Sequence, residues 1–457
     1  MTENKPTMTN SMTNYKHTIH TILAVVTFTL CVIACASCLF IATPAVAQTD
    51  LRIAGAQAGF PIALPRVCDS AGDPLTAQRL NETLEYNLKI SGVFNIMNPN
   101  TFVESSSKCD VKDIAFPDWS LIGAEGVVKG RITPSGSPGV LTYELMLYDV
   151  NKNQAVVGKK YSAGADEVKK IANRFSNEVL RYFTGETGAF GGKIAFISKH
   201  GRFKDMFVMD LDGTNVQQLT NDRGLVLSPA WSRDGKKILY TSYRSRIPEL
   251  YQYFVDTGRY TRVTNTQHLE ISGKFTSEGT IITAQSVAGI TNIVELDTSG
   301  NLIRKITDFG GISVSPSLSP NERNIAFCSN RGGNPQIYTM TRSGDDIKRV
   351  SWVNSNYCTS PAWSPKGDKL AFVCREVGGF HIYVSNIDGS NPVRLTYAGS
   401  NEDPGWSPDG RFIVFTQGGR GNAKNLFVYS LLGGNATQIT FSNNSENSMP
   451  AWDPVIE

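Results

Sequence analysis

The stretch AWSPKG at residues 362–367 decides the fold, because versions of it recur through the second half of the chain. They stand at residues 230–235 (AWSRDG), 274–279 (KFTSEG), 317–320 (SLSP), 405–410 (GWSPDG) and 451–454 (AWDP). The residues at the tryptophan position are 231, 275, 318, 363, 406 and 452, with successive spacings of 44, 43, 45, 43 and 46. A period of about 40–45 residues built from short strands is typical of β-propeller blades. The repeat therefore predicts a propeller, whose function lies in its loops and central channel.

The number of blades follows from how the repeat units begin and end. Each copy of this repeated motif, called the repeated phrase below, forms an inner strand and a tight turn. It is followed by a second strand, a third strand, a glycine-containing hairpin turn and a fourth strand. Six such third and fourth strands are present, but the first unit, residues 193–220, lacks an inner strand. The last phrase, residues 451–454, has no strands after it. Placing it in the first unit completes six blades and closes the ring, which removes exposed sheet edges. We expect a six-bladed propeller over residues 193–457.

The preceding part, residues 48–185, has the pattern of an α/β domain. Asp73-Pro74 marks a helix start, and Leu80, Leu84 and Leu88 repeat along one helix face. Alternating apolar residues predict strands at residues 124–133, 141–147 and 154–161, and a closing helix is expected over 165–184. These elements predict a mixed sheet with helices on one face. Four glycines in residues 185–192 mark the boundary, with 186–192 as the linker.

The N-terminus has the features of an export signal. Residues 21–41 are apolar, and Ala45-Val46-Ala47 precedes Gln48, which is an A-x-A cleavage site. The alternative is an uncleaved anchor, since the stretch is long enough to span a bilayer. We expect cleavage of residues 1–47, an exported product and no membrane insertion afterwards; the start codon stays open between Met1, Met8 and Met12. The net charge of +3, without a basic stripe, argues against nucleic acid as a partner.

Five cysteines remain after cleavage, in an oxidising compartment. Cys68 and Cys109 share the first domain and could pair. Cys358 and Cys374 flank a hairpin turn and face each other when the strand positions are counted outward, so a cross-strand disulfide is compatible with the geometry. Cys328 would stay single. Because none of these cysteines has metal-ligand spacing, they are expected to form structural disulfides or to be buried thiols.

No catalytic constellation is found. The sequence lacks a G-x-S-x-G elbow, and its three mature histidines, His200, His268 and His381, lie in different blades without ligand spacing. No cofactor or metal is expected. The loops that join a fourth strand to the next inner strand are long and polar, and they emerge on one face of the propeller. A polar, loop-built face is how such scaffolds bind a partner.

Several motifs in both domains resemble the TolB family, the periplasmic propeller proteins of the Tol-Pal system. In the first domain they are SGVFN at 91–95, PDWS at 117–120, VVKG at 127–130 and LTY at 141–143. TGAF at 187–190 followed by KIAF at 193–196 marks the junction, and SPAWS at 228–232 and PAW at 450–452 lie in the propeller. The phrase at 274–279 departs from the common form, so that blade's loop is expected to differ.

The resemblance implies a non-enzymatic, monomeric periplasmic protein that supports outer-membrane invagination at cell division and envelope integrity. It implies that the loop face binds the lipoprotein Pal and that the mature N-terminal segment binds TolA. The TolA segment would be Gln48, Thr49, Asp50, Leu51, Arg52 and Ile53, which suits addition of a strand to a partner's sheet. The Pal face would include His268, Glu270, Ser315, Asn356, Asn401, Glu402 and Glu446.

Two other functions compete with this one. An exported propeller enzyme acting on a small molecule in the channel would need converging carboxylates or histidines. A peptide-binding or structural module unrelated to division would differ only in its partner.

Overall fold

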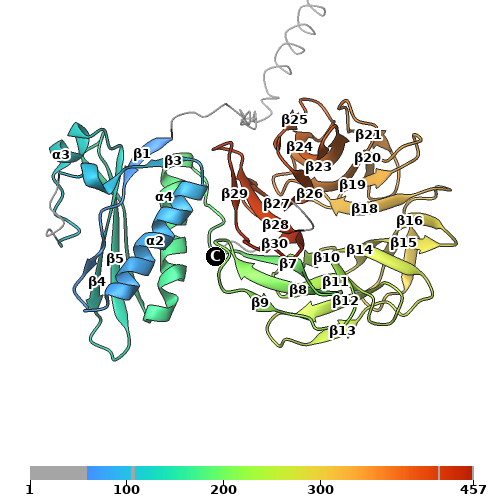
Figure 1. Ribbon diagram of the computed structural model, residues 1–457, viewed down its shortest axis with the longest axis horizontal. Helices are drawn as coiled ribbons and strands as arrows, with labels where there is room; N and C mark the ends of the chain where they lie inside the picture. Colours follow the sequence, from blue (N-terminus) through green and yellow to red (C-terminus); the bar gives the residue numbers. More distant parts are fainter. Residues whose placement is uncertain (1–58, 104–108, 420–422, 455–457) are drawn as a thin grey trace, which may run out of the picture. The chain divides into compact units, whose positions relative to one another are not determined.

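The computed structural model describes residues 59–103, 109–419 and 423–454, which form an α/β region followed by a six-bladed β-propeller (Figure 1). The predicted fold class is confirmed. The expected signal peptide, residues 1–47, and the expected TolA segment Gln48–Ile53 lie outside the described residues.

The α/β region is built on a mixed six-stranded sheet. Its order is β3-β1-β4-β5-β6, with β2 also paired to β4. β1 runs parallel to β3 and β4, and β2 runs parallel to β4, whereas β4, β5 and β6 are antiparallel. The strands are β1 (Phe60–Ala63), β2 (Cys68–Asp69), β3 (Phe94–Ile96), β4 (Gly126–Pro134), β5 (Leu141–Asp149) and β6 (Gln154–Ala163).

Two long helices, α2 (Pro74–Ile90) and α4 (Val168–Thr184), cover one face of this sheet (Figure 1). As expected, Asp73 caps α2, since its carboxylate accepts from the Thr76 amide at 3.1 Å. A 3₁₀ turn, η2 (Ala165–Glu167), precedes α4. The apolar stripe of α4, which includes Ile171, Phe175 and Val179, is buried in the core.

The other face carries a short helix that the sequence pattern did not predict. Helix α3 (Phe116–Leu121) has only six residues, too few for a helical period to show. It buries Trp119 in a second cluster with Val127 and Tyr148. A single 3₁₀ turn, η1 (Pro99–Thr101), lies before it in the chain.

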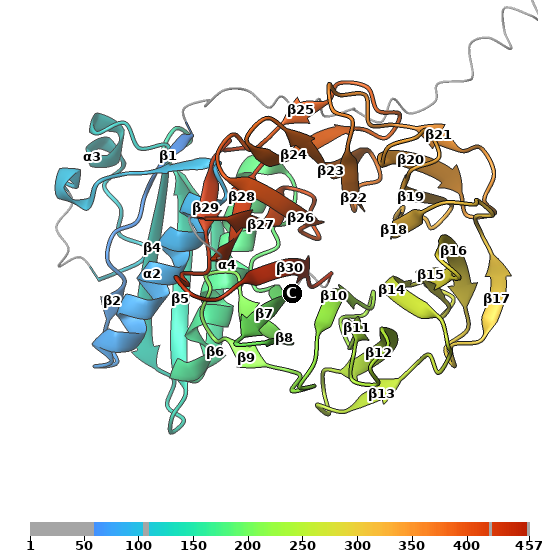
Figure 2. The same cartoon turned by 45° about the vertical axis from the view of Figure 1, so that its right-hand side comes forward.

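Six four-stranded antiparallel blades make up the propeller (Figure 2). Five consist of consecutive strands, and the sixth pairs the last strand, β30, with β7, β8 and β9, as predicted. The first strand named in each of the following sets is the inner strand. The sets are β30 (Asn447–Trp452), β7 (Lys193–His200), β8 (Phe203–Asp210) and β9 (Gln217–Gln218); β10 (Val226–Trp231), β11 (Lys237–Ser242), β12 (Glu249–Phe254) and β13 (Tyr260–Arg262); β14 (Leu269–Phe275), β15 (Ile281–Val287), β16 (Ile290–Leu296) and β17 (Leu302–Lys305); β18 (Ser313–Leu318), β19 (Asn324–Ser329), β20 (Gln336–Thr341) and β21 (Lys348–Arg349); β22 (Cys358–Trp363), β23 (Lys369–Glu376), β24 (Gly379–Asn386) and β25 (Val393–Arg394); and β26 (Ser400–Trp406), β27 (Phe412–Gly418), β28 (Lys424–Ser430) and β29 (Ala436–Gln438).

The tryptophans of the repeated phrase join neighbouring blades. The indole of Trp231 donates to the carbonyl of Ala451 at 3.0 Å, and the indole of Trp406 donates to that of Ala362 at 2.9 Å. Each bond links an inner strand to the inner strand of the preceding blade. The repeated phrase is therefore a packing element, which explains why nearly every blade has one.

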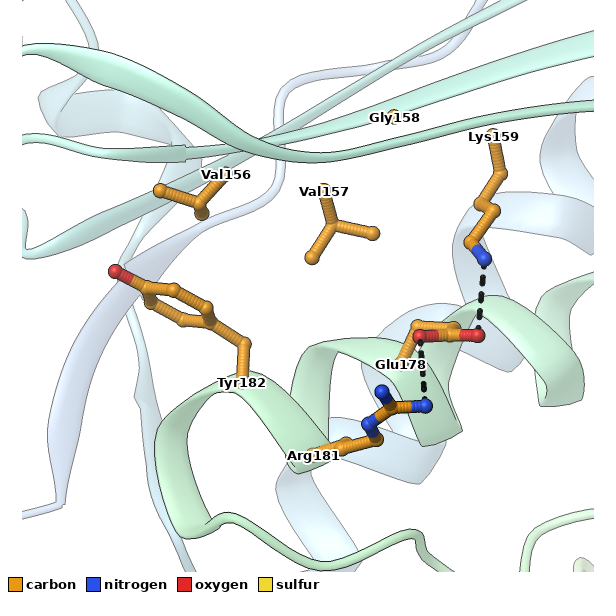
Figure 3. A pocket seen from close by; sticks show the side chains of 7 residues that line it. All are labelled: Val156, Val157, Gly158, Lys159, Glu178, Arg181 and Tyr182. Carbon is orange, nitrogen blue, oxygen red and sulfur yellow. Dashed lines mark ion pairs between the residues drawn. The ribbon is translucent and has the colours of Figure 1, made fainter.

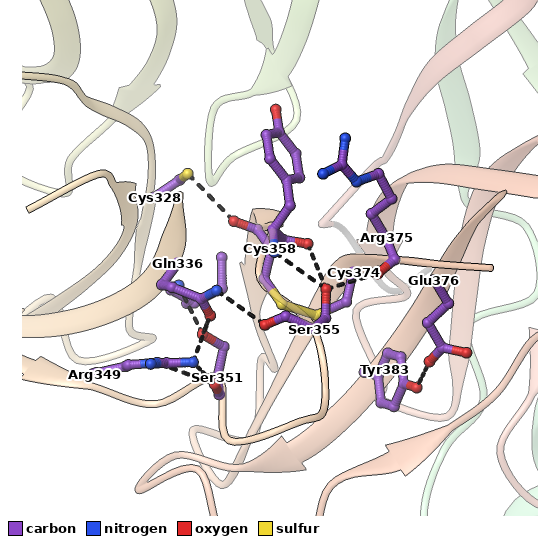
Figure 4. Close-up of a disulfide and its surroundings, with 12 residues drawn as sticks. Cys328, Gln336, Arg349, Ser351, Ser355, Cys358, Cys374, Arg375, Glu376 and Tyr383 are labelled. Carbon is purple, nitrogen blue, oxygen red and sulfur yellow. Dashed lines mark hydrogen bonds between the residues drawn. A yellow bond between two sulfur atoms is a disulfide. The ribbon is translucent and has the colours of Figure 1, made fainter. Parts of the chain in front are cut away.

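Both cysteine pairs considered from the sequence are disulfides. Cys68 bonds Cys109, and Cys358 bonds Cys374 as directly opposed residues of β22 and β23 (Figure 4). Cys328 is a buried free thiol whose sulfur lies 3.5 Å from the Cys358 carbonyl oxygen. Burial raises the pKa of this thiol to about 11, so it stays protonated and unreactive at neutral pH.

Loss of the Cys358–Cys374 bond is expected to destabilise the propeller without changing its fold. The bond closes a loop with a sequence separation of 16 residues, and restricting such a loop in the unfolded chain contributes about 3 kcal/mol. We predict that Cys358→Ala with Cys374→Ala lowers the unfolding free energy by about that amount, measured by urea denaturation under non-reducing conditions. Cys328→Ala is the control and should have a smaller effect. Equal effects of the two variants would contradict the prediction.

No helix in the described ranges is both long and apolar enough to cross a membrane.

Candidate functional site

The loop face of the propeller comprises the segments that lead from each fourth strand into the next inner strand. The six inner strands surround the centre of the ring (Figure 2). Four residues expected in these loops lie within inner strands instead: Glu270 in β14, Ser315 in β18, and Asn401 and Glu402 in β26. These residues lie in strands because each inner strand begins earlier than the apolar residues of the repeated phrase. Its first residues pair with the end of the second strand, as Glu402 does with Thr416.

Every inner strand contains a β-bulge, where its register with the second strand shifts. A bulge re-aims side chains at such a position. One non-glycine residue per bulge has a positive φ, a conformation that most L-residues avoid. Some of these residues contact their counterpart in the neighbouring blade: the Ser228 and Ser272 hydroxyls lie 3.4 Å apart, and the Met449 amide donates to Asp403 at 3.3 Å. The six are Ser228 (φ 53°), Ser272 (59°), Ser315 (53°), Ser360 (51°), Asp403 (54°) and Met449 (52°).

A cluster of charged side chains lies where the first and last blades meet on this face. Lys199 donates a hydrogen bond to Glu446, and the Lys204 ammonium lies 3.4 Å from the same carboxylate. These two lysines hold the pKa of Glu446 below its usual value, mainly through the hydrogen bond from Lys199. Next to them, Lys424 donates to Glu402 at 2.7 Å. We call Lys199, Lys204, Glu402, Asp403, Lys424 and Glu446 the loop-face charge cluster.

Asp403 is the acid at the inner end of this cluster. Its carboxylate accepts from the Thr416 hydroxyl at 3.2 Å and from the Met449 amide at 3.3 Å. Burial raises its pKa, and the negative charge of Glu402 adds to that shift. Burial lowers the pKa of Lys424, but the hydrogen bond to Glu402 and the nearby acids outweigh it, so the net shift is upward. The cluster thus holds three lysines and three acids whose charges balance, and its outer members are partly exposed.

Two residues expected on the binding face are fully buried. Glu270 accepts from the Thr266 hydroxyl at 2.6 Å and from the Gln285 amide at 3.1 Å, and so anchors the start of β14. Asn401 donates to the Ala398 carbonyl at 2.9 Å and accepts from Gln417. Both side chains organise the loops from beneath. In this conformation they present no surface to a partner.

The other expected residues are at least partly accessible. His268 is half-buried, and its backbone amide donates to the Thr266 hydroxyl. Asn356 is exposed and accepts from Arg375 at 3.4 Å. Ser315 is half-buried in its bulge. Glu402 and Glu446 belong to the loop-face charge cluster.

Sequence reasoning missed the three lysines of the cluster because they belong to other elements. Lys199 and Lys204 flank the β7–β8 hairpin turn, and Lys424 begins β28. In an up-and-down blade the turn between the second and third strands lies at the same end as the loop that enters the inner strand. Including those turns would have placed the lysines on this face.

Lys274 is an unpaired cation near the end of an inner strand. The other five blades have Ala230, Ser317, Ala362, Gly405 or Ala451 at this position. Within the described ranges the Lys274 side chain forms no hydrogen bond or ion pair. It is half-buried by surface exposure, and desolvation among the surrounding strands lowers its pKa.

We predict that Lys274→Met stabilises the protein at pH 7 by about 1 kcal/mol, because a poorly solvated charge is removed. Between the depressed folded pKa and the unfolded value of 10.5, the unfolded state binds more protons, so wild-type stability rises with pH in that window. The advantage of Lys274→Met should therefore shrink as the pH approaches 10.5. Urea denaturation at a series of pH values measures it, and a difference independent of pH would contradict the prediction.

No group of three or more His, Cys, Asp or Glu side chains with metal-binding geometry occurs among the residues that the structure describes. His200 is exposed, whereas His381 is buried, and burial together with the charge of Arg394 lowers its pKa.

Both the α/β region and the propeller match known protein families. Residues 51–156 match the TolB amino-terminal domain, and residues 180–456 match the TolB β-propeller domain. The chain belongs to the TolB family. The motifs that suggested this family from the sequence all lie within these two matched ranges, so the family resemblance is confirmed.

Relatives in this family carry the same name. The Tol-Pal system protein TolB of Anaeromyxobacter dehalogenans is 33% identical over 261 residues, which cover 56% of this chain and 59% of that protein. That of Desulfosudis oleivorans is 33% identical over 300 residues, covering 64% and 58%. The chain thus aligns with less than two thirds of the length of these relatives. The crystal structure of TolB from Acinetobacter baumannii superposes with a TM-score of 0.78 and 26% identity, covering 87% of this chain and 97% of that one.

Proposed function

We propose that this chain is the TolB component of a Tol-Pal system, a non-enzymatic periplasmic protein that supports outer-membrane invagination at division and envelope integrity. Its loop face binds the lipoprotein Pal, and its mature N-terminal segment, Gln48–Ile53, binds TolA. Membership of the TolB family carries this proposal. The loop-face charge cluster supports the Pal contact, because partly exposed, partly neutralised charges on a rigid scaffold suit a polar protein interface.

Glu270 and Glu402 are two of the acids expected on this face, and reversing their charges together would be the direct test of it. Because Glu270 is fully buried, its reversal would destabilise the blade, and the test falls on Glu402 alone. Its side chain is 34% exposed, and its ion-pair partner among the described residues is Lys424. Glu402→Lys is expected to weaken Pal binding about tenfold, which corresponds to about 1.4 kcal/mol.

The matched control is Glu278→Lys, which makes the same charge change at a 67% exposed position in the turn between β14 and β15, outside the loop face. It should bind Pal like the wild type. Both variants should unfold near the wild-type temperature. Equal affinity of Glu402→Lys and wild type for the soluble domain of Pal would remove Glu402 from the site, and equal weakening by both variants would make the effect unspecific.

The TolA contact is tested by shortening the mature chain. A chain that starts at Ala54 should lose TolA binding and keep Pal binding, because the removed residues precede every described element. Loss of both interactions would instead indicate damage to the fold.

A further inference from the structure

Strand β6 is a long edge strand with a free side. It spans ten residues, Gln154–Ala163, and among the described strands it pairs only with β5. Among the described residues, no backbone hydrogen bond joins the other side of β6 to a neighbouring strand. None of the ten residues is buried. The outward N–H and C=O groups of such an edge form a template for another strand.

A groove runs between this edge and helix α4. One cavity of about 360 Å³ is shown in Figure 3, and a second of about 300 Å³ lies next to it. They share Lys159, Glu178 and Arg181, so they form one continuous groove, which we call the β6–α4 groove. The first is lined by Val156, Val157, Gly158, Lys159, Glu178, Arg181 and Tyr182, and the second by Lys159, Tyr161, Arg174, Asn177, Glu178, Arg181 and Thr187.

One end of the groove is apolar because of a bulge in β6. The register with β5 shifts between Leu147 and Tyr148, so Val156 is an extra residue without a partner in β5. Val156 and Val157 therefore both turn toward the helix side, where they pack against the core and line the groove together with Tyr182 (Figure 3). A strand added along β6 would place an apolar side chain here.

The remainder of the groove is positively charged. Glu178 is its acid, and it pairs with Lys159 at 3.0 Å and with Arg181 at 4.0 Å (Figure 3). Arg174 is exposed and forms no ion pair with any described residue. With three cations and one anion, the groove has a net charge of +2. Its charge complements carboxylates spaced two residues apart on one face of an extended chain, about 7 Å from each other.

We propose that the β6–α4 groove is a docking site for an extended acidic segment of another protein, which adds a strand to the edge of β6. The segment places an apolar side chain against Val156, Val157 and Tyr182, and carboxylates against Lys159, Arg174 and Arg181. The groove shares no residue with the loop-face charge cluster or with Gln48–Ile53, so it offers a third interaction site.

The charges also argue against a second copy of this chain as the occupant. Lys159 and Lys160 stand next to each other in β6, and a second β6 would bring the same pair alongside. Edge lysines and a bulge are features that keep natural edges from pairing with one another. An acidic strand removes the repulsion and keeps the backbone hydrogen bonds, so the groove selects by charge.

The test uses the mature chain and a fluorescent peptide, acetyl-Thr-Val-Thr-Glu-Thr-Glu-Thr-amide, with a second peptide in which lysine replaces glutamate. Fluorescence anisotropy at low salt is expected to show at least tenfold tighter binding of the acidic peptide. Hydrogen exchange should then slow in residues 154–163. Arg174→Glu with Arg181→Glu should weaken binding at least tenfold and leave Pal binding unchanged.

The matched control is Arg79→Glu with Lys89→Glu, which makes the same charge change at exposed positions of α2, outside the groove. This control should bind the acidic peptide like the wild type. Equal binding of the two peptides, no binding of either, protection outside β6, or equal weakening by both double variants would each overturn the proposal. Concentration-dependent dimerisation abolished by Arg174→Glu with Arg181→Glu would assign the groove to a second copy and overturn it as well.

Discussion

Removing the last strand is expected to unfold the propeller. Strand β30 supplies the inner strand of the blade whose other strands are β7, β8 and β9, which lie about 250 residues earlier in the chain. Its Trp452 is buried and stacks on Phe412 of the preceding blade, with ring centroids 5.9 Å apart. Deletion of residues 447–457 exposes the edge of β7 and leaves this blade without an inner strand. We predict that Tm falls by more than about 10 °C or that cooperative unfolding disappears.

The control for this truncation is a chain shortened only by residues 455–457, which follow the strand. It should unfold like the full-length protein in calorimetry and circular dichroism. A truncation at 447 with unchanged Tm would show that the ring does not depend on closure by β30.

The second large effect is expected at Glu295, a buried acid between two blades. Its carboxylate accepts from Arg342 at 2.6 Å, from the Thr280 hydroxyl at 2.7 Å and from Arg304 at 2.8 Å, and its side chain is 6% exposed. Removing one partner of a buried ion pair leaves the remaining charges uncompensated. Because Arg304 is partly exposed, we predict that Glu295→Gln lowers the unfolding free energy by about 2–4 kcal/mol in urea denaturation at pH 7.

Glu278 provides the matched control, since it also bonds Arg342, at 2.8 Å, but is 67% exposed. Glu278→Gln should cost less than about 1 kcal/mol, as exposed pairs do. A similar loss for both variants would show that burial does not set the strength of this network.

The effect of Glu295→Gln also depends on pH in a defined direction. Burial raises the pKa of Glu295, but its hydrogen bonds to Arg342, Thr280 and Arg304 outweigh burial and hold it below the usual 4.5. A carboxyl with a depressed folded pKa stabilises the protein above its unfolded pKa and loses that contribution as the pH falls through the folded value. The difference between wild type and Glu295→Gln should therefore be full at pH 7 and shrink below about pH 4.5.

The propeller could be predicted from the sequence because the residues that form each blade lie close together in the chain and recur at a regular spacing. The phrase around Trp363 places an apolar residue and a turn in the same order in each blade, and the final copy without strands requires ring closure. The pairing of Cys358 with Cys374 followed from the same hairpin geometry. Helix α3 was missed because six residues carry no readable period.

The candidate site was less predictable, because it depends on which side chains the bulges bury. Glu270 lies five residues before Phe275 and Glu402 four residues before Trp406, so they occupy alternating strand positions that face opposite sides, and Glu270 is fully buried whereas Glu402 is partly exposed. The residue equivalent to Glu270 is Asn401, which is also buried and also accepts from a glutamine of the second strand, whereas Glu402 accepts from Lys424. Such tertiary partners leave no pattern in a single sequence. The lysines of the loop-face charge cluster come from other blades or hairpins for the same reason.

The most direct test of the proposed function is calorimetric titration of the mature protein, residues 48–457, with the soluble domain of Pal from the same organism. We predict saturable binding with one Pal per chain, weakened about tenfold by Glu402→Lys and unchanged by Glu278→Lys. A folded sample that shows no heat of binding and no complex in sedimentation would contradict it.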